Sequence, residues 1–449
     1  MVRIWNGEEV QWHLALRPDG KAGSLELGGE PRQLLLSLGE DTEDLRRGAA
    51  EAALQVRKLG GASVLLDAAP AVERLGSEGL AALIQGFELA LYRQEDWKQE
   101  KKEEPSVRLY LTGTDGVDGA AVLAETAVLD RWICFARDLV NRPANKLTPV
   151  MLARAVEQAA DGLPVAVRIL NEEETRRMEA FHAVGDSAAH PPRFIVLRYR
   201  GGGEGEAPIA LVGKGVCFDT GGYNIKTGMQ GGMKGDMAGG AAVCAAILAL
   251  AENRIPVNVT AVIPAVENRI APDSFLPGDV IGSLSGKTIE IGSTDAEGRL
   301  ILADAITYAV EEEKACKVVD VATLTGAMAH MLGGVTTGVM ANDDGFYADL
   351  QAAAAHTGEK FWRVPDYPEY KKLIESPVAD LYNSSNDGCG AIAAGMFLSA
   401  FAGKTPWLHL DIAGTGNTGK MSRPYQPKGA TGVGTATLYR LCRDQAARG

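Results

Sequence analysis

Acidic and basic side chains alternate in the segment IEIGSTDAEGRL, residues 289–300, where Asp295, Glu297 and Arg299 are spaced two positions apart. In an extended segment, residues i, i+2 and i+4 share one face, so two carboxylates and a guanidinium would crowd one small spot. A bound cation would relieve this repulsion. The alternative is a loop salt bridge combined with acidic residues at a helix start, where the helix dipole favours negative charge.

A second unusual segment is GKGVCFDTGGYNIKTGMQGGMKGDMAGG, residues 213–240, in which Lys214, Asp219, Lys226 and Asp236 lie among ten glycines. Glycine at this density lets the backbone approach a bound group closely. The segment follows an apolar strand pattern and leads into a helical one. Ligands of open α/β sheets lie at such carboxyl ends of strands.

The four carboxylates of the two segments, from Asp219, Asp236, Asp295 and Glu297, would balance two divalent cations. The chain has six histidines and neither an HExxH pair nor a Cys/His cluster, so carboxylates would supply most ligands of any metal site. Oxygen-rich sites favour Mn²⁺, Mg²⁺ or Zn²⁺. Phosphate binding is disfavoured, because GSLSGKT at residues 282–288 is one residue shorter than a phosphate-binding loop.

Composition describes an acidic globular protein. A chain of 449 residues is long enough for two domains. A net charge of −13 argues against nucleic acid as the main partner. The six cysteines form no CxxC pair, which predicts reduced thiols in a cytosolic protein. The N-terminus lacks a secretory pattern and the longest apolar run, residues 239–251, is too short to span a bilayer, so we expect a cytoplasmic protein without a membrane partner.

Strand and helix patterns alternate along the chain, which predicts an α/β fold with largely parallel sheets. Breaks at Asn141, Pro143 and Pro149 suggest a domain junction. We therefore expect an N-terminal α/β domain over residues 1–145, a linking helix over 146–165 and a catalytic domain over 166–449. In the last domain IALVGKGVCF, residues 209–218, is expected to be one strand.

STDAEGRL, residues 293–300, resembles the NTDAEGRL signature of the leucyl (cytosol) aminopeptidases, which are dinuclear metallo-exopeptidases. Segments such as VGKGVCFDTGGYNIK, MKGDMAGGAA, DVATLTGA and HLDIAG also resemble family segments, in the same order, from about residue 118 to the C-terminus. The resemblance implies a smaller macro-like N-terminal domain, a catalytic domain with a mixed eight-stranded sheet flanked by helices, and a homohexamer.

The resemblance also implies site residues and cofactors. Two divalent metal ions, Mn or Zn, would be held by Lys214, Asp219, Asp236, Asp295 and Glu297. The catalytic residues would be Lys226, stabilising the oxyanion, and Arg299, holding a bicarbonate ion. The pocket for the substrate side chain would be lined by Met233, Thr323 and Gly326.

The implied reaction is hydrolysis of the N-terminal residue from a peptide with a free N-terminus, by a hydroxide that two metals activate. The sequence departs from the family pattern at three places. Ser293 replaces Asn, the loop before Asp236 is one residue shorter and lacks an expected acidic residue, and the segment near Asp380 lacks an expected Arg. We predict that activity is retained and that substrate specificity is altered. One alternative is a catalytically impaired family member acting as a binding or regulatory protein. Another, nucleic-acid binding by the N-terminal domain, is disfavoured by the acidic charge.

Overall fold

The computed structural model describes residues 2–7, 9–17, 25–27, 33–37, 39–100, 106–228, 230–385, 387–420 and 422–447. The chain divides into two compact units. The first contains residues 1–134, 355–358 and 420–429, and the second contains residues 135–354, 359–419 and 430–449. The division falls inside helix α3 (Gly119–Asn141), and α4 (Pro149–Ala160) belongs to the second unit. The domain boundaries expected at residues 145 and 165 stay a prediction.

The first unit holds a six-stranded sheet in the order β1-β6-β5-β2-β4-β3. Neighbouring strands are parallel except for the antiparallel pair β3 and β4. The strands are β1 (Val2–Ile4), β2 (Trp12–Arg17), β3 (Leu25–Leu27), β4 (Gln33–Ser37), β5 (Ser63–Asp67) and β6 (Arg108–Thr112). Residues 32 and 38, which flank β4, lie outside the described residues.

Helices α1 (Thr42–Lys58) and α2 (Ala69–Ala90) pack against each other in the first unit. The side chain of Asp41 caps α1 by accepting a hydrogen bond from the Asp44 backbone N–H at 2.9 Å. Leu45, Ala49 and Ala53 recur at four-residue intervals and are buried, as expected for an amphipathic helix on a sheet.

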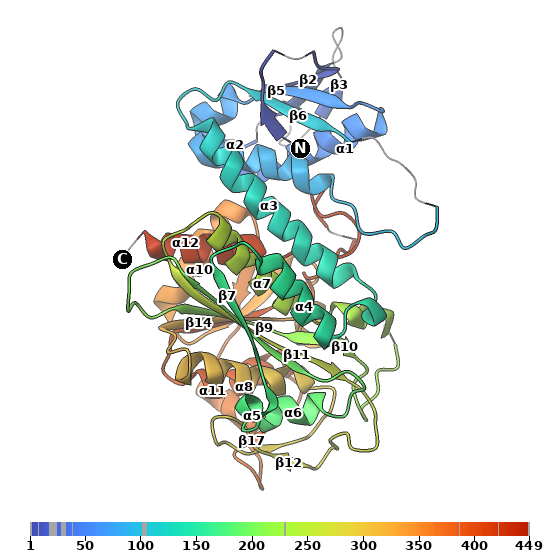
Figure 1. Ribbon diagram of the computed structural model, residues 1–449, viewed down its shortest axis with the longest axis vertical. Coiled ribbons are helices and arrows are strands. Elements are labelled where there is room, and N and C mark those ends of the chain that lie inside the picture. Colours follow the sequence, from blue (N-terminus) through green and yellow to red (C-terminus); the bar gives the residue numbers. More distant parts are fainter. Residues whose placement is uncertain are drawn as a thin grey trace. The chain divides into compact units, whose positions relative to one another are not determined.

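The second unit is built on a mixed sheet, which confirms the predicted α/β fold class (Figure 1). The sheet has nine strands instead of the eight that the resemblance implies, because β10 is added beside β11. Eight strands follow the order β16-β15-β18-β14-β9-β11-β8-β7, and the ninth, β10, pairs in parallel with β11. The strands are β7 (Val165–Leu170), β8 (Arg193–Arg200), β9 (Ile209–Gly213), β10 (Gly215–Asp219), β11 (Asn258–Asn268), β14 (Lys317–Ala322), β15 (Thr336–Ala341), β16 (Lys360–Arg363) and β18 (Trp407–Asp411).

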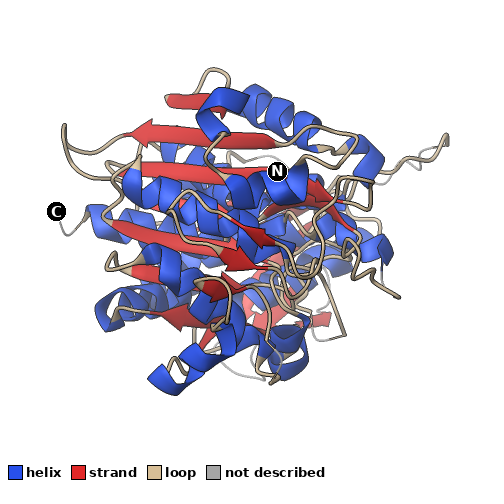
Figure 2. Cartoon of the chain, turned by 90° about the horizontal axis from the view of Figure 1, so that it is seen from below, coloured by secondary structure: helices blue, strands red, loops and turns tan. Residues whose placement is uncertain are grey.

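Helices cover both faces of this sheet, with α7 and α12 on one side and α8 and α11 on the other (Figure 1). Figure 2 shows the strands lying between helices when seen from below. The helices after α4 are α5 (Glu172–Thr175), α6 (Glu179–Gly185), α7 (Ala238–Glu252), α8 (Glu297–Glu311), α9 (Gly326–Leu332), α10 (Asp344–Thr357), α11 (Gly390–Ala402) and α12 (Thr435–Ala446). Shorter elements are the 3-10 turns η1 (Ala144–Lys146), η2 (Gln230–Gly235) and η3 (Pro368–Ile374) and a small sheet of β12 (Val280–Ile281), β13 (Ile289–Glu290) and β17 (Leu381–Tyr382).

The central strands are apolar because both of their faces are covered. All residues of β9 and β11 are buried. The stretch 230–252, which includes α7, is long and apolar enough by composition to cross a membrane, but 89% of its most apolar window is buried inside the protein. Such burial is typical of a helix in the protein core.

Candidate active site

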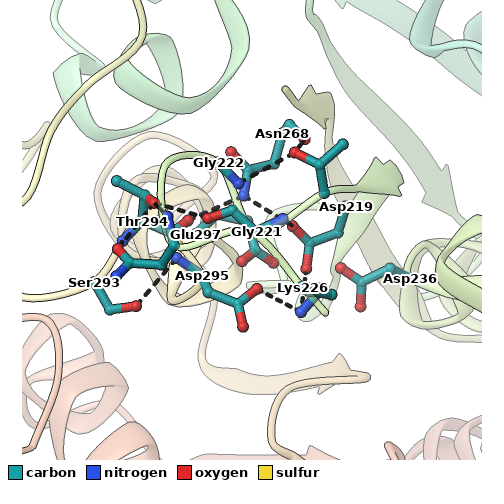
Figure 3. A network of polar contacts seen from close by, with 12 residues as sticks. Asp219, Gly221, Gly222, Lys226, Asp236, Asn268, Ser293, Thr294, Asp295 and Glu297 are labelled. Carbon is teal, nitrogen blue, oxygen red and sulfur yellow. Dashed lines mark hydrogen bonds and ion pairs between the residues drawn. The ribbon is translucent and has the colours of Figure 1, made fainter. Parts of the chain in front are cut away.

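The two chemically unusual segments meet at one edge of the larger sheet (Figure 3). Lys214 lies between β9 and β10, Asp219 ends β10, and Asp236 follows η2. Asp295 precedes α8, and Glu297 is the first residue of that helix. Strands β9, β11 and β14 are parallel to one another, so Lys214, Asn268 and Thr323, at or just after their carboxyl ends, lie at the same edge of the sheet.

Lys214 joins carboxylates from both segments. Its side chain is 3% exposed, and its Nζ lies 2.8 Å from oxygens of Asp236 and of Glu297. Burial lowers the pKa of Lys214, but the negative charges of Asp236, Glu297 and Asp219 outweigh burial and raise its pKa overall. The side chain is therefore an ammonium ion in the absence of metal. Its ion pairs are with Asp236 and Glu297.

Lys226 lies against the other two acids. Its Nζ is 2.8 Å from Asp219 Oδ2 and also contacts Asp295 Oδ1. Burial opposes the charge of Lys226, but Asp219 and the other nearby carboxylates raise its pKa overall. Burial, together with the charge of Glu297, raises the pKa of Asp295 to about 6. Each lysine thus neutralises part of a strongly anionic cluster.

Two glycines allow these close contacts. A Cβ atom added to Gly298 would lie 2.4 Å from Lys214 Cε and 2.8 Å from its Nζ, so any larger residue would displace the lysine. Gly221 has a φ of +87°, which glycine adopts without strain. Its backbone N–H donates to Asp219 Oδ1 at 2.8 Å.

The carboxylates are arranged as a cation site would require. Asp219, Asp295 and Glu297 each offer an oxygen, and these atoms lie within 4.8 Å of one another. Glu297 Oε2 is buried and has no hydrogen-bond partner among the described residues. An ionised carboxylate oxygen without a partner is costly in a buried position, so this donor set fits a divalent metal.

Arg299 follows in the first turn of α8 and is 8% exposed. Its Nε is buried and lacks a hydrogen-bond partner in the described ranges. Burial lowers the pKa of Arg299 to about 10, although the charges of Glu297 and Asp411 oppose this shift. No ion pair joins Arg299 to Asp295 or Glu297 in the part of the chain described. The described residues therefore do not form the loop salt bridge that was the alternative to a cation site.

The three residues predicted to line a substrate pocket differ in their surroundings. Thr323 belongs to the carboxylate cluster, since its hydroxyl donates to Asp236 at 2.8 Å and its carbonyl accepts from Lys214 at 3.0 Å. Gly326 begins α9, and a Cβ added there would meet no atom within 4 Å. Met233 is half-buried in η2. Met229, in the short loop before it, lies outside the described residues.

Ser293, the departure in the signature, shapes the turn before Asp295. Its Oγ accepts a hydrogen bond from the Asp295 backbone N–H at 3.2 Å. The side chain of Asn383 donates to the Ser293 carbonyl at 2.9 Å and accepts from the Gly292 N–H at 2.7 Å. Asn and Ser side chains both make such local turns, so serine preserves the backbone geometry here.

Sequence reasoning missed the polar residues that hold the two segments together. Asn268, the last residue of β11, donates to Asp219 Oδ1 at 2.8 Å and to the Thr294 carbonyl at 3.0 Å. Thr294 Oγ1 donates to the Gly221 carbonyl at 2.7 Å, and the Thr294 N–H donates to Asn224 at 2.9 Å. The only local signal for Asn268 is a polar residue at the end of an apolar strand.

Comparisons with known proteins give matches along most of the chain. Residues 134–439 match the model of the cytosol aminopeptidase family, catalytic domain. A probable cytosol aminopeptidase of Clostridium perfringens is 44% identical over 423 residues, covering 91% of this chain and 85% of the relative. One from Cenarchaeum symbiosum is 38% identical over 442 residues, covering 95% of this chain and 90% of the relative.

Solved structures are similar along the same length. The bottromycin maturation enzyme BotP in complex with Mn matches with a TM-score of 0.87 at 31% identity, covering 98% of this chain and 100% of that chain. A mutant of tomato leucine aminopeptidase matches with a TM-score of 0.85 at 31% identity, covering 95% of this chain and 84% of that chain.

Proposed function

Because the chain belongs to the cytosol aminopeptidase family, we propose that its carboxylate cluster binds two divalent metal ions and that the enzyme removes single residues from the N-termini of peptides. Family membership makes the chain a metal-dependent aminopeptidase. The assignment of residues and the mechanism are our proposal. A relative in complex with Mn supports Mn²⁺ as one candidate metal, and Zn²⁺ is the other.

The proposed ligands are Lys214, Asp219, Asp236, Asp295 and Glu297. Bound divalent ions would supply Lewis acidity, polarising the scissile carbonyl and lowering the pKa of a water molecule. Lys214 must lose its proton to serve as a ligand. The protein favours its ammonium form when metal is absent, so we expect metal binding to release a proton.

Two cationic side chains would act on the substrate. The Lys226 ammonium is held at the edge of the carboxylate cluster by Asp219 and Asp295, where it can donate to a developing oxyanion. The buried Arg299 guanidinium would bind bicarbonate through charge-assisted hydrogen bonds and so hold a group that accepts a proton. Thr323 would keep Asp236 in place, and open space beside Gly326 would receive the substrate side chain.

The observation that carries the proposal is the group of three carboxylates within 4.8 Å, one of whose buried oxygens has no partner among the described residues. The test is hydrolysis of aminoacyl p-nitroanilides before and after metal removal by a chelator, with Mn²⁺ or Zn²⁺ added back. Glu297→Gln keeps the shape of the side chain and removes its charge. Glu311→Gln, at the exposed end of the same helix, is the matched control.

We expect chelation and Glu297→Gln to abolish hydrolysis, added metal to restore the wild type, and Glu311→Gln to behave as wild type. A Glu297→Gln enzyme as active as wild type would overturn the proposal, as would full activity after chelation. A folded protein that binds peptides but hydrolyses none would favour the binding or regulatory alternative.

We also propose that the enzyme works in the cytoplasm as a homohexamer on peptides with a free N-terminus, without a membrane or nucleic-acid partner. The names of the relatives support the location. Light scattering coupled to size-exclusion chromatography tests the assembly, and a mass close to that of one chain would contradict it.

A further inference from the structure

Asn268 occupies a special position between the two segments that form the site. It is fully buried at the end of β11, and the parallel register of β10 and β11 places it directly beside Asp219. Its Nδ2 donates to Asp219 Oδ1 at 2.8 Å and to the Thr294 carbonyl at 3.0 Å (Figure 3). Both partners are pure acceptors, so the amide nitrogen, and not the oxygen, must face them.

The first of these bonds fixes the orientation of Asp219. Oδ1 accepts hydrogen bonds from the Asn268 amide and from the Gly221 backbone, each at 2.8 Å. With Oδ1 held by two donors, Oδ2 is the atom left to face Lys226 and the centre of the carboxylate cluster. The carboxylate cannot rotate without breaking both bonds.

The second bond reaches the other segment. The Thr294 carbonyl immediately precedes Asp295, so one amide group fixes Asp219 and the backbone beside Asp295 at the same time. Thr294 also hydrogen-bonds to the Gly221 carbonyl and to the Asn224 side chain, but Thr294 itself donates to neither carboxylate. Lys214 and Lys226 also join the two segments, but through charged side chains that contact carboxylates. Asn268 joins them through a neutral amide, which donates both to a proposed ligand and to the backbone of the opposite segment.

We propose that Asn268 is a positioning residue that makes carboxylates from the two segments converge on one metal site. The proposal rests on the proposed function of Asp219 as a ligand. A neutral donor is required at this position, because aspartate would add a negative charge beside Asp219 and alanine would leave Oδ1 with one donor. Residues that orient metal ligands typically change metal affinity on the order of 10- to 100-fold when they are removed.

The chain offers a matched control in Asn258, at the start of the same strand. Asn258 is also buried, and its Nδ2 also donates two hydrogen bonds, to the carbonyls of Gly203 and Glu206 at 2.9 and 3.0 Å. Its hydrogen-bond partners, Gly202, Gly203 and Glu206, lie outside the carboxylate cluster. Asn258→Ala therefore reports the loss of a similar buried amide at a position away from the proposed ligands.

The experiment titrates Mn²⁺ into the metal-free full chain by isothermal calorimetry, for the wild type, Asn268→Ala, Asn268→Asp, Asn258→Ala and Asp219→Ala. Unfolding temperatures of the metal-free proteins are measured in parallel. We expect Asn268→Ala to weaken Mn²⁺ binding at least 10-fold, and Asn258→Ala to lower the unfolding temperature without changing Mn²⁺ affinity. Asn268→Asp keeps the size of the side chain and provides the same test if the alanine variant does not fold.

The outcomes separate this inference from the proposed function. A wild type that binds no Mn²⁺ would overturn the proposed function and this inference with it. A second outcome would overturn the positioning role alone. In it the wild type binds Mn²⁺ strongly, Asp219→Ala loses this binding, and the folded Asn268 variants keep the wild-type affinity within about twofold. Equal weakening in the Asn268 and Asn258 variants would also overturn it, because the effect would then be a general loss of packing.

Discussion

Replacing Gly298 by alanine should separate activity from stability. The added Cβ would lie 2.4 Å from Lys214 Cε, so this contact must lengthen by roughly 1 Å to reach an ordinary van der Waals separation. Lys214 is fully buried and held by Asp236, Glu297 and the Thr323 carbonyl, so it can yield only by moving away from these partners. A misplacement of about 1 Å in a catalytic site can cost on the order of 100-fold in rate.

The same change should affect stability much less than activity. Alanine is favoured over glycine inside a helix by about 1 kcal/mol, which offsets part of the steric cost. The assay is kcat/KM on an aminoacyl p-nitroanilide at saturating Mn²⁺, together with the free energy of unfolding in urea. Gly345→Ala, at the exposed second residue of α10, is the control and should keep full activity. A Gly298→Ala enzyme within threefold of wild-type kcat/KM would refute the reasoning.

Three further changes test other parts of the site and the fold. Lys226→Met removes the ammonium and should lower kcat on the order of 100- to 1,000-fold with folding intact, measured by steady-state kinetics and circular dichroism; an unchanged kcat would exclude oxyanion stabilisation by this residue. Thr323→Val keeps the shape of the side chain but removes the hydroxyl that donates to Asp236, so Mn²⁺ affinity should fall on the order of 10-fold in calorimetric titration. Burial raises the pKa of Asp304 to about 7. Between about pH 4 and 7 the folded protein therefore holds a proton that the unfolded chain releases, so the free energy of unfolding should fall as pH rises through this range. Asp304→Asn cannot ionise and should flatten this dependence in urea unfolding at several pH values, whereas an unchanged slope would place the titration elsewhere.

Much of the fold could be predicted from local patterns, because apolar runs and helical periodicity report burial directly. The break predicted at Asn141 is the end of α3, and the alternating α and β elements form the predicted α/β fold. The sheet of the first unit is parallel except for one pair, whereas the larger sheet is mixed. The residues 209–218 were wrongly expected to form one strand. The strand is interrupted at Lys214, between β9 and β10, because the backbone turns there and brings the Lys214 side chain among the carboxylates.

β2 (Trp12–Arg17) was missed, although its buried Trp12, Leu14 and Leu16 alternate with partly exposed residues, as in a half-buried strand. The charged residues of the site were found because their density is unusual in the sequence. Asn268 could not be found in this way. Its role depends on the register between β10 and β11, two strands far apart in the sequence, and no local pattern specifies that pairing.

The most direct test of the account is to locate the metal ions. Crystals of the wild-type chain grown with Mn²⁺ and measured near the Mn absorption edge would give anomalous peaks at each bound ion. We predict two peaks, both within ligand distance of the carboxylates of Asp219, Asp236, Asp295 and Glu297. Peaks at other residues, or none at these carboxylates in crystals of active enzyme, would contradict the account.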